Sequence, residues 1–262
     1  MAIVTMSYRS TLLARDITFK AYLPIDRPVE GGFAYRGPVK PFRTLYLLHG
    51  LTKDCSDWLN STRIERISRN NNLAVIFPNG ENSFYVNGLA PNSDFGRLIG
   101  EELVDFTRSV FPLSTRREDT YIGGVSMGGF GALRNGLKYA ERFSKIISFS
   151  AAIHMFEFEP GDTRRQMVVG EDGIMGDYWE AVKTDKNPAV CLENLVKAVK
   201  AGEKSFPEIY MICGLQDSLI FANRTFSAKL KEAGVPLIYE EYDGKHEFEF
   251  WNQHVARMVE WL

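Results

Sequence analysis

Short apolar runs that end in turn residues recur along this chain of 262 residues. Their length and their β-branched and aromatic content are typical of strands buried on both faces of a sheet. Such strands are predicted at residues 44–50, 73–78, 119–124, 144–150, 208–214 and 236–242. Apolar and polar residues instead alternate over 17–24, which predicts a half-buried antiparallel strand.

Amphipathic helical patterns lie between these runs, most clearly at residues 95–111, 218–234 and 246–262. Strands that alternate with helices predict the α/β class, with a mainly parallel sheet covered by helices on both faces. No repeat, low-complexity block or long linker divides the chain, so we expect a single domain over residues 1–262.

Residues 151 to about 205 separate two predicted core strands by more than a crossover helix requires. Long segments inside compact domains are often lids or binding loops. We therefore expect a cap or lid insertion at about 151–205.

The composition is ordinary for a globular protein, with 45% hydrophobic and 24% charged residues and a formal net charge of −2. No basic stripe is present, so we expect neither nucleic acid nor an anionic membrane surface as a partner. No apolar run approaches the roughly 18 residues that span a bilayer.

The three cysteines, Cys55, Cys191 and Cys213, are odd in number and widely spaced. They form neither a zinc pattern nor a disulfide framework. The first 16 residues lack the charged and apolar regions of a signal peptide. These features predict reduced thiols and a cytoplasmic protein without a metal or an organic cofactor.

The stretch YIGGVSMGGFG contains the pattern G-x-S-x-G between a predicted strand and a predicted helix. A join with almost no loop forces a sharp reversal at Ser126 and requires small neighbours, here Gly124 and Gly128. Such a turn exposes the hydroxyl at the end of the sheet, as a nucleophile requires. A chance glycine-rich turn is the alternative interpretation.

A serine hydroxyl needs a base to remove its proton and a group to orient that base. Of the four histidines, His246 follows the last predicted strand at the edge where Ser126 projects, and it is the candidate base. His154 is kept as a weaker candidate. His49 is expected to fix the loop after an early strand, and His254 lies within the last helix.

The acid is expected between the serine and the histidine in the chain. Asp217 follows a buried strand at the same edge, although an aspartate there also caps the next helix well. Asp243 is a rival only three residues from His246. An oxyanion hole needs two backbone N–H donors. Met127 after the serine and Leu51 in the loop HGLTKD are our candidates.

These segments resemble the α/β-hydrolase esterases of the esterase D group, which includes S-formylglutathione hydrolases, tributyrin esterases and related acetylxylan and feruloyl esterases. The matching stretches are LLHGLTKDCSDW, FPNGENSFYVN, YIGGVSMGGFGALRNGLKYAERF, CGLQDSL and GKHEFEFW. The first of them is most similar to intracellular tributyrin esterases. The resemblance implies an α/β-hydrolase fold, hydrolysis of small esters by Ser126, His246 and Asp217, and often a homo-oligomer. Gly244-Lys245 departs from the usual Gly-Gly before the histidine.

Aromatic residues and one histidine near the predicted catalytic edge are candidates for the substrate pocket: Trp58, Tyr85, His154, Phe156, Trp179 and Trp251. An apolar roof from the insertion predicts a small acyl site that takes acetyl to butyryl groups. The alternatives are a thioesterase of the S-formylglutathione type, a feruloyl or acetylxylan esterase, or an inactive binding module with a hydrolase fold.

Overall fold

A computed structural model describes residues 2–25, 28–29, 32–35, 41–156 and 174–262. Its main sheet has eight strands in the spatial order β1-β2-β6-β5-β7-β8-β9-β10. The strands are β1 (Ala2–Ser10), β2 (Arg15–Leu23), β5 (Arg43–Leu48), β6 (Leu73–Pro78), β7 (Thr120–Val125), β8 (Lys145–Phe149), β9 (Glu208–Gly214) and β10 (Leu237–Tyr242). Pairing is antiparallel from β1 to β6 and parallel from β6 to β10. The predicted mainly parallel sheet is confirmed.

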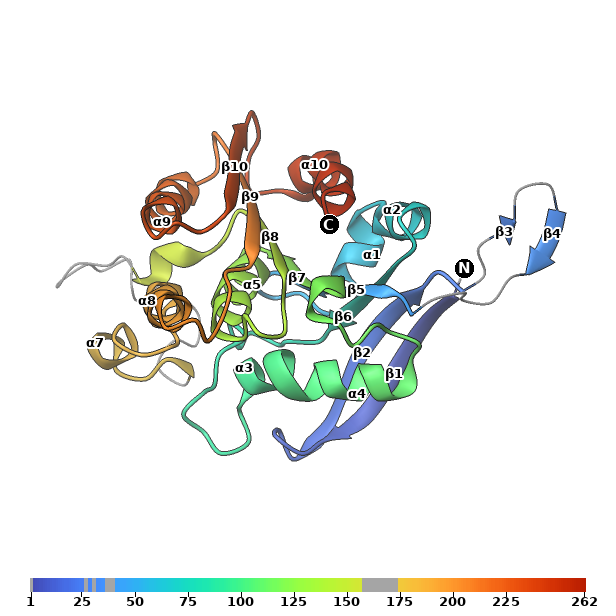
Figure 1. Ribbon diagram of the computed structural model, residues 1–262, viewed down its shortest axis with the longest axis horizontal. Coiled ribbons are helices and arrows are strands. Elements are labelled where there is room, and N and C mark those ends of the chain that lie inside the picture. The colour runs from blue at the N-terminus through green and yellow to red at the C-terminus, as the bar shows by residue number, and fades with distance from the viewer. Residues whose placement is uncertain (1, 26–27, 30–31, 36–40, 157–173) are drawn as a thin grey trace.

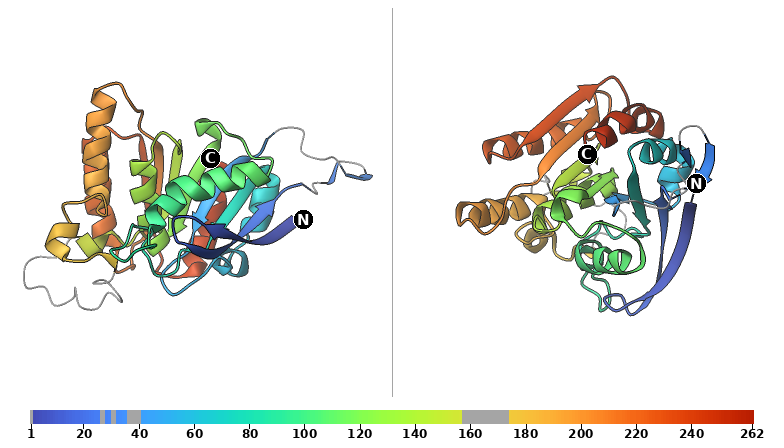
Figure 2. Two further views of the ribbon diagram at one scale, coloured as in Figure 1. Left: turned by 90° about the horizontal axis from the view of Figure 1, so that it is seen from below. Right: turned by 45° about the vertical axis from the view of Figure 1, so that its right-hand side comes forward.

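Helices cover both faces of this sheet (Figures 1 and 2). The α-helices are α1 (Asp57–Ser61), α2 (Ile64–Asn70), α3 (Phe95–Arg97), α4 (Leu103–Val110), α5 (Met127–Lys138), α7 (Tyr178–Ala181), α8 (Pro188–Lys200), α9 (Ile220–Glu232) and α10 (Phe248–Glu260). The helix predicted at 95–111 contains a π-helical turn, Leu98–Glu102, between α3 and α4. Short 3-10 turns lie at Arg117–Asp119 and Ile153–Phe156.

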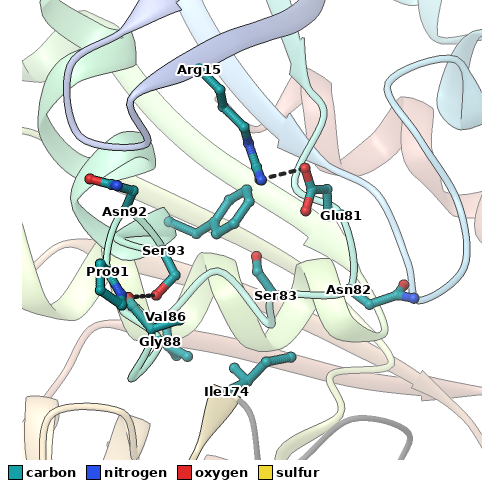
Figure 3. Close-up of a pocket in the computed structure, with 12 residues that line it drawn as sticks. Arg15, Glu81, Asn82, Ser83, Val86, Gly88, Pro91, Asn92, Ser93 and Ile174 are labelled. Atoms are coloured by element: carbon teal, nitrogen blue, oxygen red, sulfur yellow. Dashed lines mark hydrogen bonds and ion pairs between the residues drawn. The ribbon is translucent and has the colours of Figure 1, made fainter.

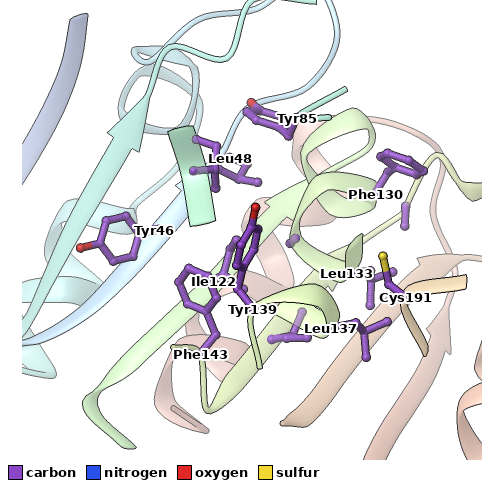
Figure 4. Packing of buried hydrophobic residues seen from close by; sticks show 14 of the residues in the cluster. Tyr46, Leu48, Tyr85, Ile122, Phe130, Leu133, Leu137, Tyr139, Phe143 and Cys191 are labelled. Atoms are coloured by element: carbon purple, nitrogen blue, oxygen red, sulfur yellow. The ribbon is translucent and has the colours of Figure 1, made fainter. Parts of the chain in front are cut away.

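The parallel strands contribute side chains to two separate cores, which explains their continuous apolar sequences. In β7, Ile122 packs in a core with α4, α5, α8 and α9, which Figure 4 shows in part. Its neighbour Tyr121 points to the other face and packs with α2 and α10. Because successive side chains alternate between faces, a strand covered on both sides has to be apolar throughout.

Strand β1 was not predicted, although it pairs with β2 along its whole length. Its inward residues Val4, Met6 and Tyr8 are half-buried against the core. Ile3 points outward and is 46% exposed. Because this apolar residue lies on the solvent face, the sequence of β1 does not alternate regularly between apolar and polar residues. A small hairpin, β3 (Pro28–Val29) and β4 (Gly32–Tyr35), stands apart from the main sheet in Figure 1.

The predicted insertion at 151–205 includes an ordinary crossover helix. Helix α8 packs beside α5 and contributes Cys191, Leu192 and Leu195 to the core, so it belongs to the layer that covers the sheet. Any cap is therefore confined to the segment before α8. Residues 157–173 of that segment lie outside the described residues, and the cap stays a prediction.

Candidate active site

Ser126 alone joins β7 to α5, and its backbone adopts the strained conformation that such a join requires. Its φ is 56° and its ψ is −117°, a combination that L-residues rarely adopt. The Ser126 N–H donates to the carbonyl oxygen of Phe149 at 2.9 Å, and the Ser126 carbonyl accepts from the N–H of Phe130 at 2.9 Å. The turn is thus held by β8 on one side and by the first turn of α5 on the other.

The two glycines of the motif allow backbone segments to approach closely. A Cβ atom on Gly124 would lie 2.3 Å from the carbonyl oxygen of Gly128. A Cβ atom on Gly128 would lie 2.4 Å from the carbonyl oxygen of Leu48, at the end of β5. Real Cβ contacts are not this short, so only glycine lets α5 begin against the strand ends.

His246 lies between Ser126 and Asp217 and contacts both. Its Nε2 atom is 2.9 Å from the Ser126 Oγ atom, and its Nδ1 atom is 2.9 Å from the Asp217 Oδ2 atom. An ionised carboxylate only accepts hydrogen bonds, so Nδ1 carries the proton and Nε2 is left to accept the serine hydroxyl. This is the geometry in which an imidazole can remove the serine proton.

Asp217 is buried, with 2% of its surface exposed. Burial raises its pKa, but hydrogen bonds from His246 and from the N–H of Leu219 at 2.9 Å outweigh burial and lower the pKa below its usual value. The contacts to Leu219 and to His246 use different oxygens of Asp217. Leu219 is itself the N-cap of α9, without a side-chain cap hydrogen bond, so the contact from its N–H to Asp217 holds the turn before the helix. The role of Asp217 as the acid stays a prediction. The rival Asp243 is exposed and accepts a hydrogen bond from Gln216 at 3.4 Å.

Leu51 and Met127 are the candidate oxyanion donors. Leu51 borders the same cavity as Ser126, and Met127 is the first residue of α5. The first N–H groups of a helix have no partner within the helix and carry partial positive charge, which suits a developing oxyanion. Their role in catalysis stays a prediction.

His49 is buried and fixes the loop that carries Leu51. Its Nε2 atom accepts the N–H of Gly80 at 2.9 Å, so Nδ1 carries the proton and donates to the Gly50 carbonyl oxygen at 2.7 Å. Burial lowers the pKa of His49 and keeps the ring neutral. His254 lies in α10, where its ring stacks on Tyr242 at 4.3 Å.

A cavity of about 400 Å³ opens beside Ser126. Trp251 borders it, and its contact with substrate stays a prediction. The sequence analysis did not single out Lys53, Asp57, Glu247 or Phe248. The complete lining is Gly50, Leu51, Lys53, Asp57, Val125, Ser126, His246, Glu247, Phe248 and Trp251.

Two predicted pocket residues, Trp58 and Tyr85, lie in the core instead. Trp58 is 1% exposed, and its indole N–H donates to the Leu48 carbonyl oxygen at 2.9 Å. Tyr85 is fully buried, and its hydroxyl donates to the His49 carbonyl oxygen at 3.0 Å. Both side chains support the loop that carries Leu51, because each bonds to the backbone at the end of β5.

His154, Phe156 and Trp179 flank the segment 157–173. Phe156 stacks on Phe130 with ring centres 5.9 Å apart. Trp179 is 38% exposed, and His154 is half-buried. None of these three borders the cavity beside Ser126 that the described residues form. Their contact with substrate stays a prediction.

Ser150, which no sequence pattern marked, contacts the loops of the candidate triad together with Trp251. Ser150 is fully buried at the end of β8 with a φ of 47°, and its Oγ atom accepts the Trp251 indole N–H at 3.1 Å. The Ser150 hydroxyl also helps to lower the pKa of Asp217. The Trp251 ring lies edge-on to the His246 ring at 4.9 Å. No local pattern reveals this group, because its members come from four separate segments.

A second cavity of about 330 Å³ lies between the β1–β2 turn and the loop after β6 (Figure 3). The polar side chains that line this cavity largely form hydrogen bonds and ion pairs with neighbouring protein groups. Arg15 pairs with Glu81 at 2.6 Å, and the hydroxyl of Ser83 donates to the Gly80 carbonyl oxygen. Asn82 in its wall accepts the N–H of Thr52 at 2.8 Å, so the loop after β6 supports the loop that carries Leu51.

Within the described ranges, no group of three or more His, Cys, Asp or Glu residues could hold a metal ion. The helices that the structure describes include none long and apolar enough to cross a membrane.

Comparison with known proteins places this chain among esterases. Residues 10–262 match the family described as "Putative esterase". An acetyl esterase from Caldicellulosiruptor saccharolyticus is 40% identical over 266 residues, which cover 100% of this chain and 98% of that protein.

Two solved structures from Staphylococcus aureus are similar along nearly the whole chain. The fluorophosphonate-binding serine hydrolase FphF is 31% identical with a TM-score of 0.81, and the match covers 99% of this chain and 97% of that one. The S-formylglutathione hydrolase FrmB is 30% identical with a TM-score of 0.78, covering 99% and 98%.

Proposed function

Because this chain belongs to the esterase family, it is a carboxylic ester hydrolase, and we propose that Ser126, His246 and Asp217 perform the reaction through an acyl-enzyme. The observation that carries the proposal is the pair of 2.9 Å contacts from His246 to the hydroxyl and to the carboxylate. The strained turn at Ser126 supports it, because strain of this kind persists where function requires it.

In the proposed mechanism, His246 takes the Ser126 proton as Oγ attacks the ester carbonyl. Asp217 holds the imidazole and stabilises its charged form. The N–H groups of Leu51 and Met127 receive the oxyanion, where one donor is typically worth about 2.7–4 kcal/mol. The alcohol leaves with a proton from His246, and water then repeats the steps on the acyl-enzyme.

We propose short acyl groups, acetyl to butyryl. The acetyl esterase relative supports this range. The experiment compares kcat/KM for p-nitrophenyl acetate, butyrate and decanoate with wild type and with Ser126→Ala. We expect acetate or butyrate to be fastest and the variant to lose turnover. Fastest hydrolysis of decanoate would rule out the short-acyl proposal.

Thioester hydrolysis is the second candidate, and the similarity to S-formylglutathione hydrolase FrmB favours it. Esters and thioesters use the same catalytic groups, so a thiol-release assay with S-formylglutathione separates them. A feruloyl or acetylxylan esterase would show its preference in the same panel. The intact contacts of His246 argue against an inactive binding module.

A cytoplasmic location, a tributyrin esterase-like substrate range and a homo-oligomer are also proposed. The three free, buried cysteines support the location, since buried unpaired thiols suit a reducing compartment. Size-exclusion chromatography with light scattering tests the oligomeric state.

A further inference from the structure

Asp57 is a buried carboxylate in the cavity beside Ser126, and the proposed mechanism does not use it. The residue begins α1 and is 8% exposed. Its Oδ2 atom is enclosed and has no hydrogen-bond partner among the described residues. Because an unpaired buried carboxylate oxygen is costly, such a group is usually explained by a ligand or a functional role.

Among the described residues, no hydrogen bond or ion pair accounts for the burial of the Asp57 side chain. No ion pair or side-chain hydrogen bond to Asp57 is formed within the described part of the chain, and Ser56, not Asp57, occupies the N-cap of α1. The nearby Asp54 is exposed and accepts the N–H of Ser56 at 2.6 Å. Burial raises the pKa of Asp57, the charge of Lys53 lowers it, and the charge of Asp54 raises it.

Asp57 and His246 line the same cavity beside Ser126. His246 borders the same cavity and, in the proposed mechanism, gives its proton to the departing alcohol. In that mechanism the departing alcohol lies next to His246 and can extend into this cavity. Lys53 also borders the cavity and would repel a cationic group. A neutral donor, such as a hydroxyl, fits both side chains.

We propose that Asp57 is a specificity-determining residue that accepts a hydrogen bond from a hydroxyl group on the alcohol portion of the substrate. The chain then prefers esters of polyols to esters of simple alcohols. This inference rests on the proposed esterase function at Ser126. Sites built to bond a substrate hydroxyl reject analogues that lack it, because the protein group is left unpaired.

The test compares kcat/KM for 2,3-dihydroxypropyl acetate and propyl acetate. We expect wild type to prefer the diol ester about tenfold or more. Asp57→Leu removes both acceptor oxygens and is expected to bring the ratio near one. Asp57→Asn keeps one acceptor oxygen and is expected to retain part of the preference. The matched control Asp54→Asn removes a neighbouring charge outside the cavity lining and is expected to keep the wild-type ratio.

The outcomes separate the inference from the esterase function. If propyl acetate is hydrolysed but the ratio is the same in wild type and both Asp57 variants, the inference is overturned and the esterase function stands. If wild type cleaves neither ester, the inference about Asp57 and the proposed esterase function are both overturned. A second pair, acetylcholine and its neutral isostere 3,3-dimethylbutyl acetate, probes the sign of charge. A strong preference of wild type for acetylcholine would also overturn the inference, because it would assign Asp57 to a cation.

Discussion

The side chain of Gln216 ties the loop of the candidate acid to the loop of the candidate base. The side-chain Oε1 atom accepts the N–H of Gly244 at 2.7 Å, and the backbone N–H of Gln216 donates to the Gly244 carbonyl oxygen at 3.0 Å. Asp217 is the next residue in one loop, and His246 lies two residues further along in the other. The position of the Asp217 carboxylate relative to the His246 imidazole therefore depends on Gln216, whose side chain contacts neither group.

We expect Gln216→Ala to lower kcat for p-nitrophenyl acetate about fivefold. The reason is that the loss of a hydrogen bond worth about 1 kcal/mol lets the two loops separate. The matched control is Asp243→Ala, which removes only the 3.4 Å contact to the Gln216 amide. This control is expected to keep nearly full activity. A larger loss in Asp243→Ala than in Gln216→Ala would favour Asp243 as the acid.

Gly128→Ala is expected to destabilise the fold by about 1–3 kcal/mol and to reduce activity strongly. The added Cβ atom would meet the Leu48 carbonyl oxygen at 2.4 Å, and only backbone movement near Ser126 relieves that contact. Thermal unfolding and ester turnover measure the two effects.

Gly202→Ala is the control for the Gly128 substitution. Nothing lies within 4 Å of an added Cβ atom there, although φ is +75°. Its cost is therefore only about 1–2 kcal/mol of backbone strain, with activity retained. Equal activity of the two variants would show that the close approach at Gly128 does not position the serine.

Stability is expected to fall as the pH drops from 7 to 5, in part because of His49. Burial holds the pKa of His49 below its ordinary value of 6.5, so the unfolded chain binds the proton first. The stabilisation is complete above 6.5 and is lost as the pH falls below it, by up to about 1.4 kcal/mol per pH unit. His254 has a lowered pKa and contributes in the same direction.

His49→Gln removes this titrating group, so its stability should decline less between pH 7 and 5 in urea unfolding. Parallel stability curves for wild type and His49→Gln would show that the ring titrates alike in the folded and unfolded chains.

The strands, the main helices and the glycine turn were predictable because their signals are local. An apolar run between turn residues marks a strand buried on both faces, and the spacing of Gly124 and Gly128 around Ser126 marks a sharp turn. Chain order and position after a strand were enough to select Asp217 and His246 as candidates. Strand β1 was missed because Ile3 on its solvent face obscures the alternation.

The walls of the cavity were less predictable, since burial depends on residues distant in sequence. Trp58 and Tyr85 follow strand ends as pocket residues do, but their polar atoms bond to backbone in the core. Asp57 is the residue before Trp58 in the chain, and it belongs to the lining of the cavity beside Ser126. Nothing in the sequence separates an aspartate that lines a cavity from one that is solvated.

The most direct test of the central claim is covalent labelling of Ser126 by a fluorophosphonate probe, followed by mass spectrometry of the peptides. The proposed mechanism predicts one adduct per chain on Ser126, with labelling abolished in Ser126→Ala and strongly slowed in His246→Ala. An unlabelled Ser126 in protein that hydrolyses p-nitrophenyl acetate, or an adduct on another residue, would contradict it.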